Sequence, residues 1–303
     1  MRSQRYRMYG LTLRSEVPLP APLAPSSPVD VDLYRSSQER FGSFGARVLA
    51  QLTLGHRQVY TLWQHPWGYR LRFEHCCTLE FQRDLRKVWV IPHAGVPLSL
   101  VGQVLVGSVP TTVLTLSGEW VLHASAVETF GQALAFAGDA GAGKTTLAAA
   151  FCAQGFGLIT DDLLRFQFRD DQAWAVPGTG RLRLRQDVVA AFPELPAKPI
   201  AEGRWEVIYG GISDPVPLGV LFLPQVSETV TRPEFRPLSP HEALFRLLGA
   251  VKLKPLKDKA LLEARLQRLA QLVQRVPVVH LQVPRRLEAL PHVVQEILAR
   301  FAP

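Results

Sequence analysis

The sequence predicts a mixed α/β protein with a smaller β-rich domain in residues 1–117 and an α/β domain in residues 118–303. The length of 303 residues favours two domains. Apolar and β-branched stretches separated by Gly, Pro and His fill the first region. Beyond residue 118, short apolar strand candidates alternate with helix candidates, which is typical of a layered fold with a largely parallel sheet. The hydrophobic share of 47% excludes a disordered or fibrous chain.

The β-rich region has three clear strand candidates, at residues 57–63, 69–73 and 88–91. The proline-rich residues 18–28 predict an extended connector, because polyproline geometry disfavours a helix. No residue of this region is assigned to chemistry. We therefore expect it to recognise the substrate or to support the second domain structurally.

The second region alternates between strands and helices. Gly155 stands just past the first helix, where glycine commonly ends one, and Ser239 precedes Pro240 as a capping residue. The predicted strands are residues 120–122, 133–137, 158–160, 220–223 and 278–283. The predicted helices are residues 145–154, 240–249, 261–275 and 290–301.

Composition and termini predict a soluble cytoplasmic protein. No run approaches the roughly 18 uncharged apolar residues that a membrane-spanning helix needs. The charged N-terminus lacks the apolar segment of a secretory signal. Three cysteines, of which Cys76 and Cys77 are adjacent, cannot build a disulfide framework and are expected to be core thiols rather than metal ligands. The sequence leaves the oligomeric state open, a homo-oligomer included.

The net charge of +8 favours an anionic partner such as a nucleotide or an acidic peptide, although Arg-rich composition also serves solubility alone. The densest basic stretch, residues 252–259, contains an acid and a proline and lacks interleaved aromatic residues. Stacking of bases needs such aromatic residues. The sequence therefore does not favour a nucleic-acid partner.

Residues 138–145 match the complete phosphate-binding pattern G-x-x-x-x-G-K-[ST]. An apolar strand candidate precedes the pattern and an Ala-rich helix candidate follows it. Glycines let backbone N–H groups turn toward phosphate oxygens, Lys144 is expected to reach the outer phosphates, and the Thr145 hydroxyl is suited to Mg²⁺. The predicted nucleotide-binding residues are Gly138, Asp139, Ala140, Gly141, Ala142, Gly143, Lys144, Thr145 and Thr146.

Paired carboxylates, Asp161 and Asp162, follow the next strand candidate. Ligands of open α/β sheets bind at the carboxyl ends of strands, so the pair is expected to face the phosphates. One carboxylate can serve Mg²⁺, and the other can accept a proton from an attacking hydroxyl. His123 lies among small residues just before the loop-bearing strand, and a histidine in such a place is more often structural.

Together these motifs resemble the catalytic domain of HPr kinase/phosphorylase. The resemblance is carried by Leu122-His-Ala-Ser-Ala126, by Gly138 to Thr146 and by Gly155-Phe-Gly-Leu-Ile-Thr-Asp-Asp162. It implies a core like that of ATP-dependent phosphoenolpyruvate carboxykinase. Looser similarity extends to HPr-kinase-related kinases of lasso-peptide biosynthesis clusters, which phosphorylate a serine of the precursor peptide. No copy of the Arg-Gly-rich segment with which HPr kinases engage HPr is recognised, so another acceptor is expected.

The resemblance implies an ATP- and Mg²⁺-dependent kinase acting on a serine of a peptide or protein. In this interpretation Asp161 is the base, His123 orients it, Lys144 holds phosphates, and Thr145 with Asp162 binds Mg²⁺; the order of the two aspartates could be reversed. Arg183, Arg185 and Lys198 are candidates for neutralising charge on the transferred group. Two alternatives remain, a nucleotide-binding regulator or NTPase without an acceptor, and a small-molecule kinase or carboxykinase-like enzyme.

Overall fold

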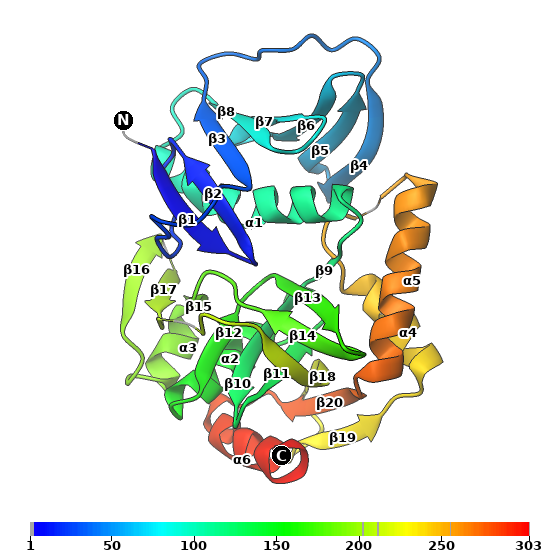
Figure 1. Ribbon diagram of the computed structural model, residues 1–303. Helices are drawn as coiled ribbons and strands as arrows, with labels where there is room; N and C mark the ends of the chain where they lie inside the picture. The colour runs from blue at the N-terminus through cyan, green and yellow to red at the C-terminus, as the bar shows by residue number, and fades with distance from the viewer. Residues whose placement is uncertain (1–2, 202, 211, 255, 303) are drawn as a thin grey trace. The chain divides into compact units, whose positions relative to one another are not determined.

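The computed structural model describes residues 3–201, 203–210, 212–254 and 256–302. Within these ranges the strands form an eight-stranded, a nine-stranded and a three-stranded sheet, here called the N-terminal, central and small sheets (Figure 1). The chain divides into two compact units. Unit 1 comprises Met1–Glu119 and Leu253–Arg265, and unit 2 comprises Trp120–Lys252 and Leu266–Pro303.

Unit 1 contains the N-terminal sheet, whose strands lie in the order β1-β2-β3-β8-β7-β6-β5-β4. Strands β4 to β8 follow one another as an antiparallel meander, which confirms the strands expected at residues 57–63, 69–73 and 88–91. Residues 18–28 contain no helix, as predicted. The strands are β1 Gln4–Met8, β2 Leu11–Ser15, β3 Val31–Arg35, β4 Arg47–Leu54, β5 Arg57–His65, β6 Gly68–Phe73, β7 Cys77–Gln82 and β8 Lys87–Pro92.

Helix α1, Leu98–Leu116, was not predicted in the β-rich region. It carries no charged residue, and its length and composition would allow it to cross a membrane, so the expectation that no such run exists is wrong. Gly, Ser, Thr and Pro residues stand among its apolar residues without adding charge, so the segment was not recognised as one long apolar run. Within the protein 61% of this stretch is buried, and Val101, Leu105 and Val109 are fully enclosed.

Unit 1 also includes residues 253–265, which the prediction placed in the second domain. Leu256 forms an antiparallel bridge with Ala50 of β4, and the Lys257 N–H donates to the Leu49 carbonyl at 2.7 Å. Arg47 and Asp258 form an ion pair at 2.7 Å. The assignment differs from the prediction because the segment bonds to the edge strand of the N-terminal sheet, and such a long-range pairing leaves no local sequence pattern.

Unit 2 is built on the central sheet, in which β11 pairs in parallel with β18 and β18 with β20. The other pairings given for this sheet are antiparallel, so the expectation of a largely parallel sheet is wrong. Tight turns explain the difference: Phe130–Gly131 and Asp170–Asp171, all with positive φ, join neighbouring strands directly instead of through a helix. The strands are β9 Val121–Leu122, β10 Ala124–Thr129, β11 Gln132–Ala137, β12 Gly157–Thr160, β13 Leu164–Arg169, β14 Gln172–Val176, β18 Val216–Ser227, β19 Glu234–Pro237 and β20 Val278–Pro284.

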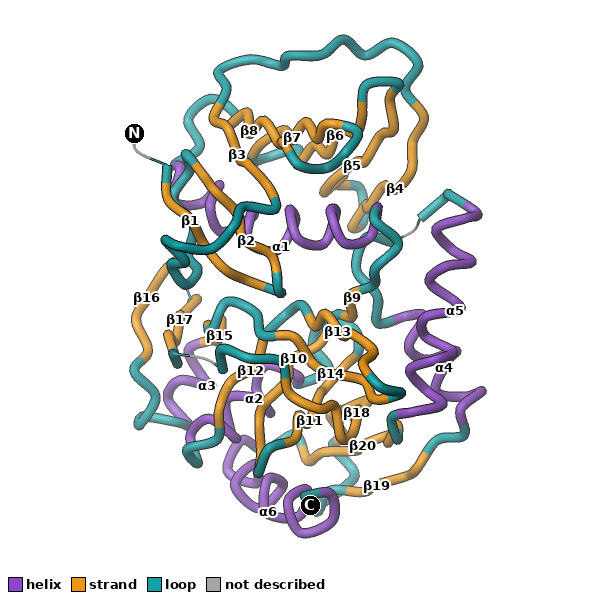
Figure 2. The backbone as a smooth tube through the Cα atoms, viewed as in Figure 1, coloured by secondary structure: helices purple, strands orange, loops and turns teal. Residues whose placement is uncertain are grey.

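Helices cover both faces of the central sheet, as Figure 2 shows. On one face α2, Lys144–Ala153, packs with α6, Leu290–Phe301, and the short η1, Leu287–Ala289, precedes α6. On the other lie α4, Pro240–Gly249, and the part of α5, Lys259–Arg275, that belongs to unit 2. All four helices predicted in this region are confirmed.

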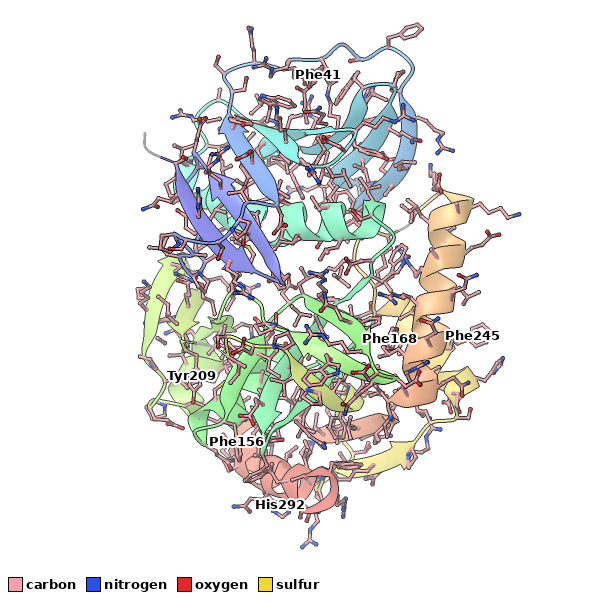
Figure 3. The ribbon with its side chains drawn as sticks, viewed as in Figure 1. Phe41, Phe156, Phe168, Tyr209, Phe245 and His292 are labelled. Atoms are coloured by element: carbon pink, nitrogen blue, oxygen red, sulfur yellow. The ribbon has the colours of Figure 1, made fainter. Side chains whose placement is uncertain are left out.

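The small sheet has the order β15-β17-β16, with β15 Arg181–Arg185, β17 Arg204–Ile208 and β16 Ala197–Ala201, and α3, Gln186–Ala191, follows β15. Leu182, Leu184 and Val207 on one face join the core around α2. Tyr209, labelled in Figure 3, donates its hydroxyl to the Cys152 carbonyl of α2 at 2.8 Å. The small sheet is thereby fixed beside the helix that follows the glycine-rich loop.

Candidate active site

The glycine-rich loop, residues 138–143, joins β11 to α2, as the sequence predicts. Gly141 and Gly143 have φ of +85° and +90°, which L side chains rarely adopt. Lys144 opens α2 and is only 5% exposed, and its Nζ donates to the Asp139 carbonyl at 2.8 Å. Burial, together with the nearby charge of Lys252, lowers the pKa of Lys144 below its ordinary value. The ammonium group is therefore held over the loop, where it can bind phosphate oxygens.

Asp161 follows β12 and lies beneath the start of α2. Its Oδ1 accepts hydrogen bonds from the Ser125 hydroxyl at 2.6 Å and from the Thr145 hydroxyl at 2.8 Å. Its Oδ2 accepts the backbone N–H of Arg183 at 3.4 Å. The residue is 8% exposed, and burial, with the adjacent Asp162 charge, raises the pKa of Asp161 in spite of these donors.

Asp162 lies in a different environment, because its φ of +68° turns the chain away from Asp161. His123 Nε2 lies 3.1 Å from its Oδ1, and Lys252 Nζ lies 2.7 Å from the same oxygen. The side chain is 59% exposed. Partial desolvation by the surrounding protein opposes the charged form, but the contacts with His123 and Lys252 outweigh it and hold the pKa of Asp162 well below its usual range.

The surroundings of His123 favour the neutral form of its ring. Burial lowers its pKa, and the charges of Lys252 and Lys144 lower it further, against the opposing effect of Asp162. A neutral ring that faces a carboxylate through Nε2 must carry its proton on that nitrogen, so His123 donates to Asp162. In this form the histidine donates to the carboxylate and orients it.

The fold brings together the predicted site residues His123, Lys144, Thr145, Asp161 and Asp162. The predicted Thr145–Asp162 metal pair is not the pair in contact, since Thr145 bonds to Asp161. Sequence reasoning did not assign Ser125 and Lys252 to the site. Ser125 lies on β10, two residues beyond His123, which stands at the bend between β9 and β10. In the sequence Lys252 was recognised only as part of a basic stretch. Its approach to Asp162 spans 90 residues and leaves no local pattern.

A cavity of about 610 Å³ opens beside the first turn of α2, within the size range of small-molecule sites. Lys144, Thr145 and Thr146 line it on the helix side. The predicted charge-neutralising residues Arg183 and Arg185 line it, whereas Lys198 is not among its lining residues. The basic side chains of the lining are Lys144, Arg183, Arg185, Arg204, Arg285 and Arg286, and its acidic ones are Asp187 and Glu288. Such a lining suits a polyanion such as a nucleoside triphosphate.

The donor set fits Mg²⁺ held jointly with a nucleotide. Among the residues that the structure describes, no group of three His, Cys, Asp or Glu side chains could hold a metal by itself. Mg²⁺ bound with a nucleotide needs only one or two protein oxygens besides phosphates and water. The Thr145 hydroxyl and the Asp161 carboxylate supply such oxygens side by side. Cys76 and Cys77 are buried free thiols outside this site.

No family model matches the chain, and no curated protein matches it. Among solved structures, the HPr(Ser) kinase/phosphatase from Coxiella burnetii matches with a TM-score of 0.33 and 13% sequence identity. The match covers 59% of this chain and 93% of that protein. A similarity of this size carries no argument about activity, so the case for a function rests on the geometry of the site.

Proposed function

We propose that this protein is an ATP- and Mg²⁺-dependent kinase that transfers the γ-phosphoryl group to a hydroxyl, most simply a serine of a peptide or protein. One observation carries the proposal. Two adjacent carboxylates lie near the Lys144 ammonium group with separate partners, Asp161 bonded to Thr145 and Asp162 bonded to His123. This separation suits phosphoryl transfer, which needs one group to bind the metal and another to accept the proton of the attacking hydroxyl.

Nucleotide and metal binding are assigned to the loop and to Asp161. Lys144 and the N-terminus of α2 would hold the outer phosphates. Thr145 and Asp161 would hold Mg²⁺, which reverses the first assignment of the aspartates, because the Thr145 hydroxyl contacts Asp161 and not Asp162. When bound, Mg²⁺ supplies neutralisation of charge on the phosphates. The raised pKa of Asp161 reflects a buried charge that a cation would offset.

Proton transfer is assigned to Asp162. His123 and Lys252 both bond to its Oδ1, so we assign Oδ2 to the acceptor hydroxyl. As the acceptor oxygen bonds to the γ-phosphorus, the bond from phosphorus to the β–γ bridging oxygen breaks and ADP leaves. The hydroxyl proton passes to Asp162. The lowered pKa keeps this carboxylate ionised and able to accept the hydrogen bond of the acceptor hydroxyl, whose acidity rises as its oxygen bonds to phosphorus.

Two variants test the proposal. Asp162→Asn should bind MgATP about as well as the wild type and lose phosphoryl transfer by roughly a hundred- to ten-thousandfold, because a general base contributes that much. Asp161→Asn should weaken nucleotide affinity in the presence of Mg²⁺ and leave metal-free nucleotide binding almost unchanged. Peptide libraries incubated with MgATP and read by mass spectrometry report transfer, and fluorescence titration reports binding.

The same measurements separate the alternatives. A regulator or NTPase without an acceptor would hydrolyse ATP, leave every peptide mass unchanged and retain hydrolysis in Asp162→Asn. A small-molecule kinase would show ADP release that depends on an added metabolite and not on peptides. Normal nucleotide turnover by Lys144→Ala would contradict nucleotide binding at the loop itself.

A further inference from the structure

The small sheet presents a strongly basic face on the side opposite its core face. Residues at alternate positions of a strand share one side of the sheet, which places Arg181, Arg183 and Arg185 together. The register continues this face across the sheet, because Arg185 pairs with Arg204, and both Arg183 and Lys198 pair with Glu206. We call Arg181, Arg183, Arg185, Lys198 and Arg204 the basic face.

Among the residues that the structure describes, two carboxylates pair with cations of the basic face. Glu206 is 4% exposed and accepts a hydrogen bond from Arg181 at 2.6 Å, which fixes that guanidinium in place. Asp187 of α3 pairs with Arg185 at 2.6 Å, and both side chains are more than half exposed. In the described part of the chain, the five cations of the basic face outnumber the two carboxylates that pair with it, which favours an anionic partner.

The basic face leads directly into the active site. The backbone N–H of Arg183 bonds to Asp161, and Arg183, Arg185 and Arg204 line the cavity beside α2. Arg181 and Lys198 belong to the basic face but are not among the residues that line the cavity, so the positive charge extends beyond the cavity. Lys144, Arg285 and Arg286 also line the cavity and are available to the phosphates of a nucleotide. The basic face thus extends beyond what the nucleotide itself would cover.

We propose that the basic face docks an acidic, extended segment of the acceptor polypeptide and so delivers its hydroxyl to Asp162. The transfer step in this inference rests on the proposed kinase function, whereas the docking does not. The three arginines of β15 lie at every second residue, about 6.4–6.8 Å apart, which is also the repeat of side chains on one side of an extended peptide. Acidic residues at alternate positions can therefore meet successive guanidinium groups, which pair well with carboxylates.

A polypeptide fits the basic face better than a nucleic acid. Binding of single-stranded nucleic acid usually combines a basic groove with aromatic side chains on which bases stack. The neighbouring tryptophan, Trp205, pairs with Leu184 and so lies on the opposite side of the small sheet. The basic face consists of arginines and a lysine around a buried glutamate, which suits carboxylates.

Binding of designed peptides to the full chain tests this inference. The probes are three fluorescein-labelled peptides, each with one serine and with Asp, Asn or Lys at alternate positions. Their binding is measured by fluorescence anisotropy in the absence of nucleotide. We expect the Asp peptide to bind tightest and to weaken as salt rises. Lys198→Glu should reduce its affinity about three- to tenfold, as reversal of one exposed charge does. Lys87→Glu, an exposed lysine on β8 of unit 1, is the matched control and should bind like the wild type.

Several results would overturn the docking proposal: equal affinity for the Asp and Asn peptides, equal affinity of the two lysine variants, or tighter binding of single-stranded DNA than of the Asp peptide. A parallel loss of nucleotide affinity in Lys198→Glu would assign that lysine to the nucleotide and would also overturn the docking proposal.

Incubation with MgATP separates the docking proposal from the kinase proposal. If the Asp peptide binds but gains no phosphoryl mass, docking stands and the kinase assignment falls. If the Asn peptide is phosphorylated equally fast, the kinase assignment stands and docking falls.

Discussion

Asp161 and Asp162 are adjacent in the chain but have opposite electrostatic environments, so neutralising each should change stability in opposite directions. The pKa of Asp161 is raised above the unfolded value of about 3.9, so its ionisation at neutral pH destabilises the fold. Asp161→Asn should therefore raise the melting temperature at pH 7. The gain should vanish as the pH falls toward about 4, where the unfolded carboxyl is also protonated.

Asp162→Asn provides the matched comparison. The pKa of Asp162 is depressed, so its charge stabilises the folded state above the unfolded pKa, and this stabilisation is lost as the pH falls through the folded pKa. Asp162→Asn should lower the melting temperature at pH 7, because Lys252 and His123 lose a charged partner. Calorimetry on both variants between pH 4 and pH 8 measures the two effects. Shifts of the same sign would contradict the opposed environments described here.

The residues of the site were predictable from their spacing, but their partners were not. The phosphate-binding pattern identified Lys144 and Thr145, because a loop of that composition has few other uses. The order of the two aspartates depends on the left-handed backbone at Asp162, which local propensity does not reveal. Lys252 and the cavity arginines Arg285 and Arg286 reach the site only through the tertiary fold.

At the scale of elements, Gly143 tests how the loop works, because it joins the loop to α2 with a φ of +90°. A Cβ at this position would lie 3.3 Å from Val226 Cγ2, and its backbone conformation is unfavourable for any L side chain. Gly143→Ala should cost about 1–2 kcal/mol in unfolding free energy and should also weaken nucleotide binding by tenfold or more, since the amides of the loop would be displaced.

Gly155 gives a control at the other end of α2. It has the same φ of +90°, but a Cβ there meets nothing within 4 Å. Gly155→Ala should cost a similar backbone penalty and leave nucleotide affinity unchanged. Chemical denaturation of both variants measures the free energy of unfolding, and nucleotide titration measures the affinity of the site. An equal loss of affinity in the two variants would show that the effect passes through the stability of α2 and not through the loop.

Elements with a strong local pattern were predicted, and those that depend on turn chemistry or long-range pairing were not. The strand, loop and helix around Lys144 follow from an apolar run, glycines and an Ala-rich segment in sequence order. The parallel sheet was wrongly expected because Phe130–Gly131 and Asp170–Asp171 were not recognised as hairpin turns. Helix α1 was missed because Gly, Ser, Thr and Pro weaken its helical propensity, and burial compensates for that loss.

At the scale of the whole molecule, unit 1 is discontinuous in sequence, which predicts the behaviour of a fragment. Residues 120–303 expressed alone would lack β4, the partner of Leu256 and Lys257. We expect amides near Lys257 to exchange with deuterium far faster in the fragment than in the full chain, because their bonds to β4 are lost. Amides of α2 should keep their protection and act as the internal control. Unchanged protection near Lys257 would contradict the assignment of this segment to unit 1.

The return of residues 253–265 to unit 1 also determines what a single backbone cut can do. The chain passes between the units three times, after residues 119, 252 and 265, and the last passage lies within α5. A protease that cleaves at residues 117–119 leaves two pieces, yet the second piece still carries a segment that bridges to β4 of the first. The nicked protein should therefore elute as one species from a native sizing column and separate into two bands only under denaturation. Cleavage of the backbone at this place would therefore leave the two pieces bound to each other under native conditions.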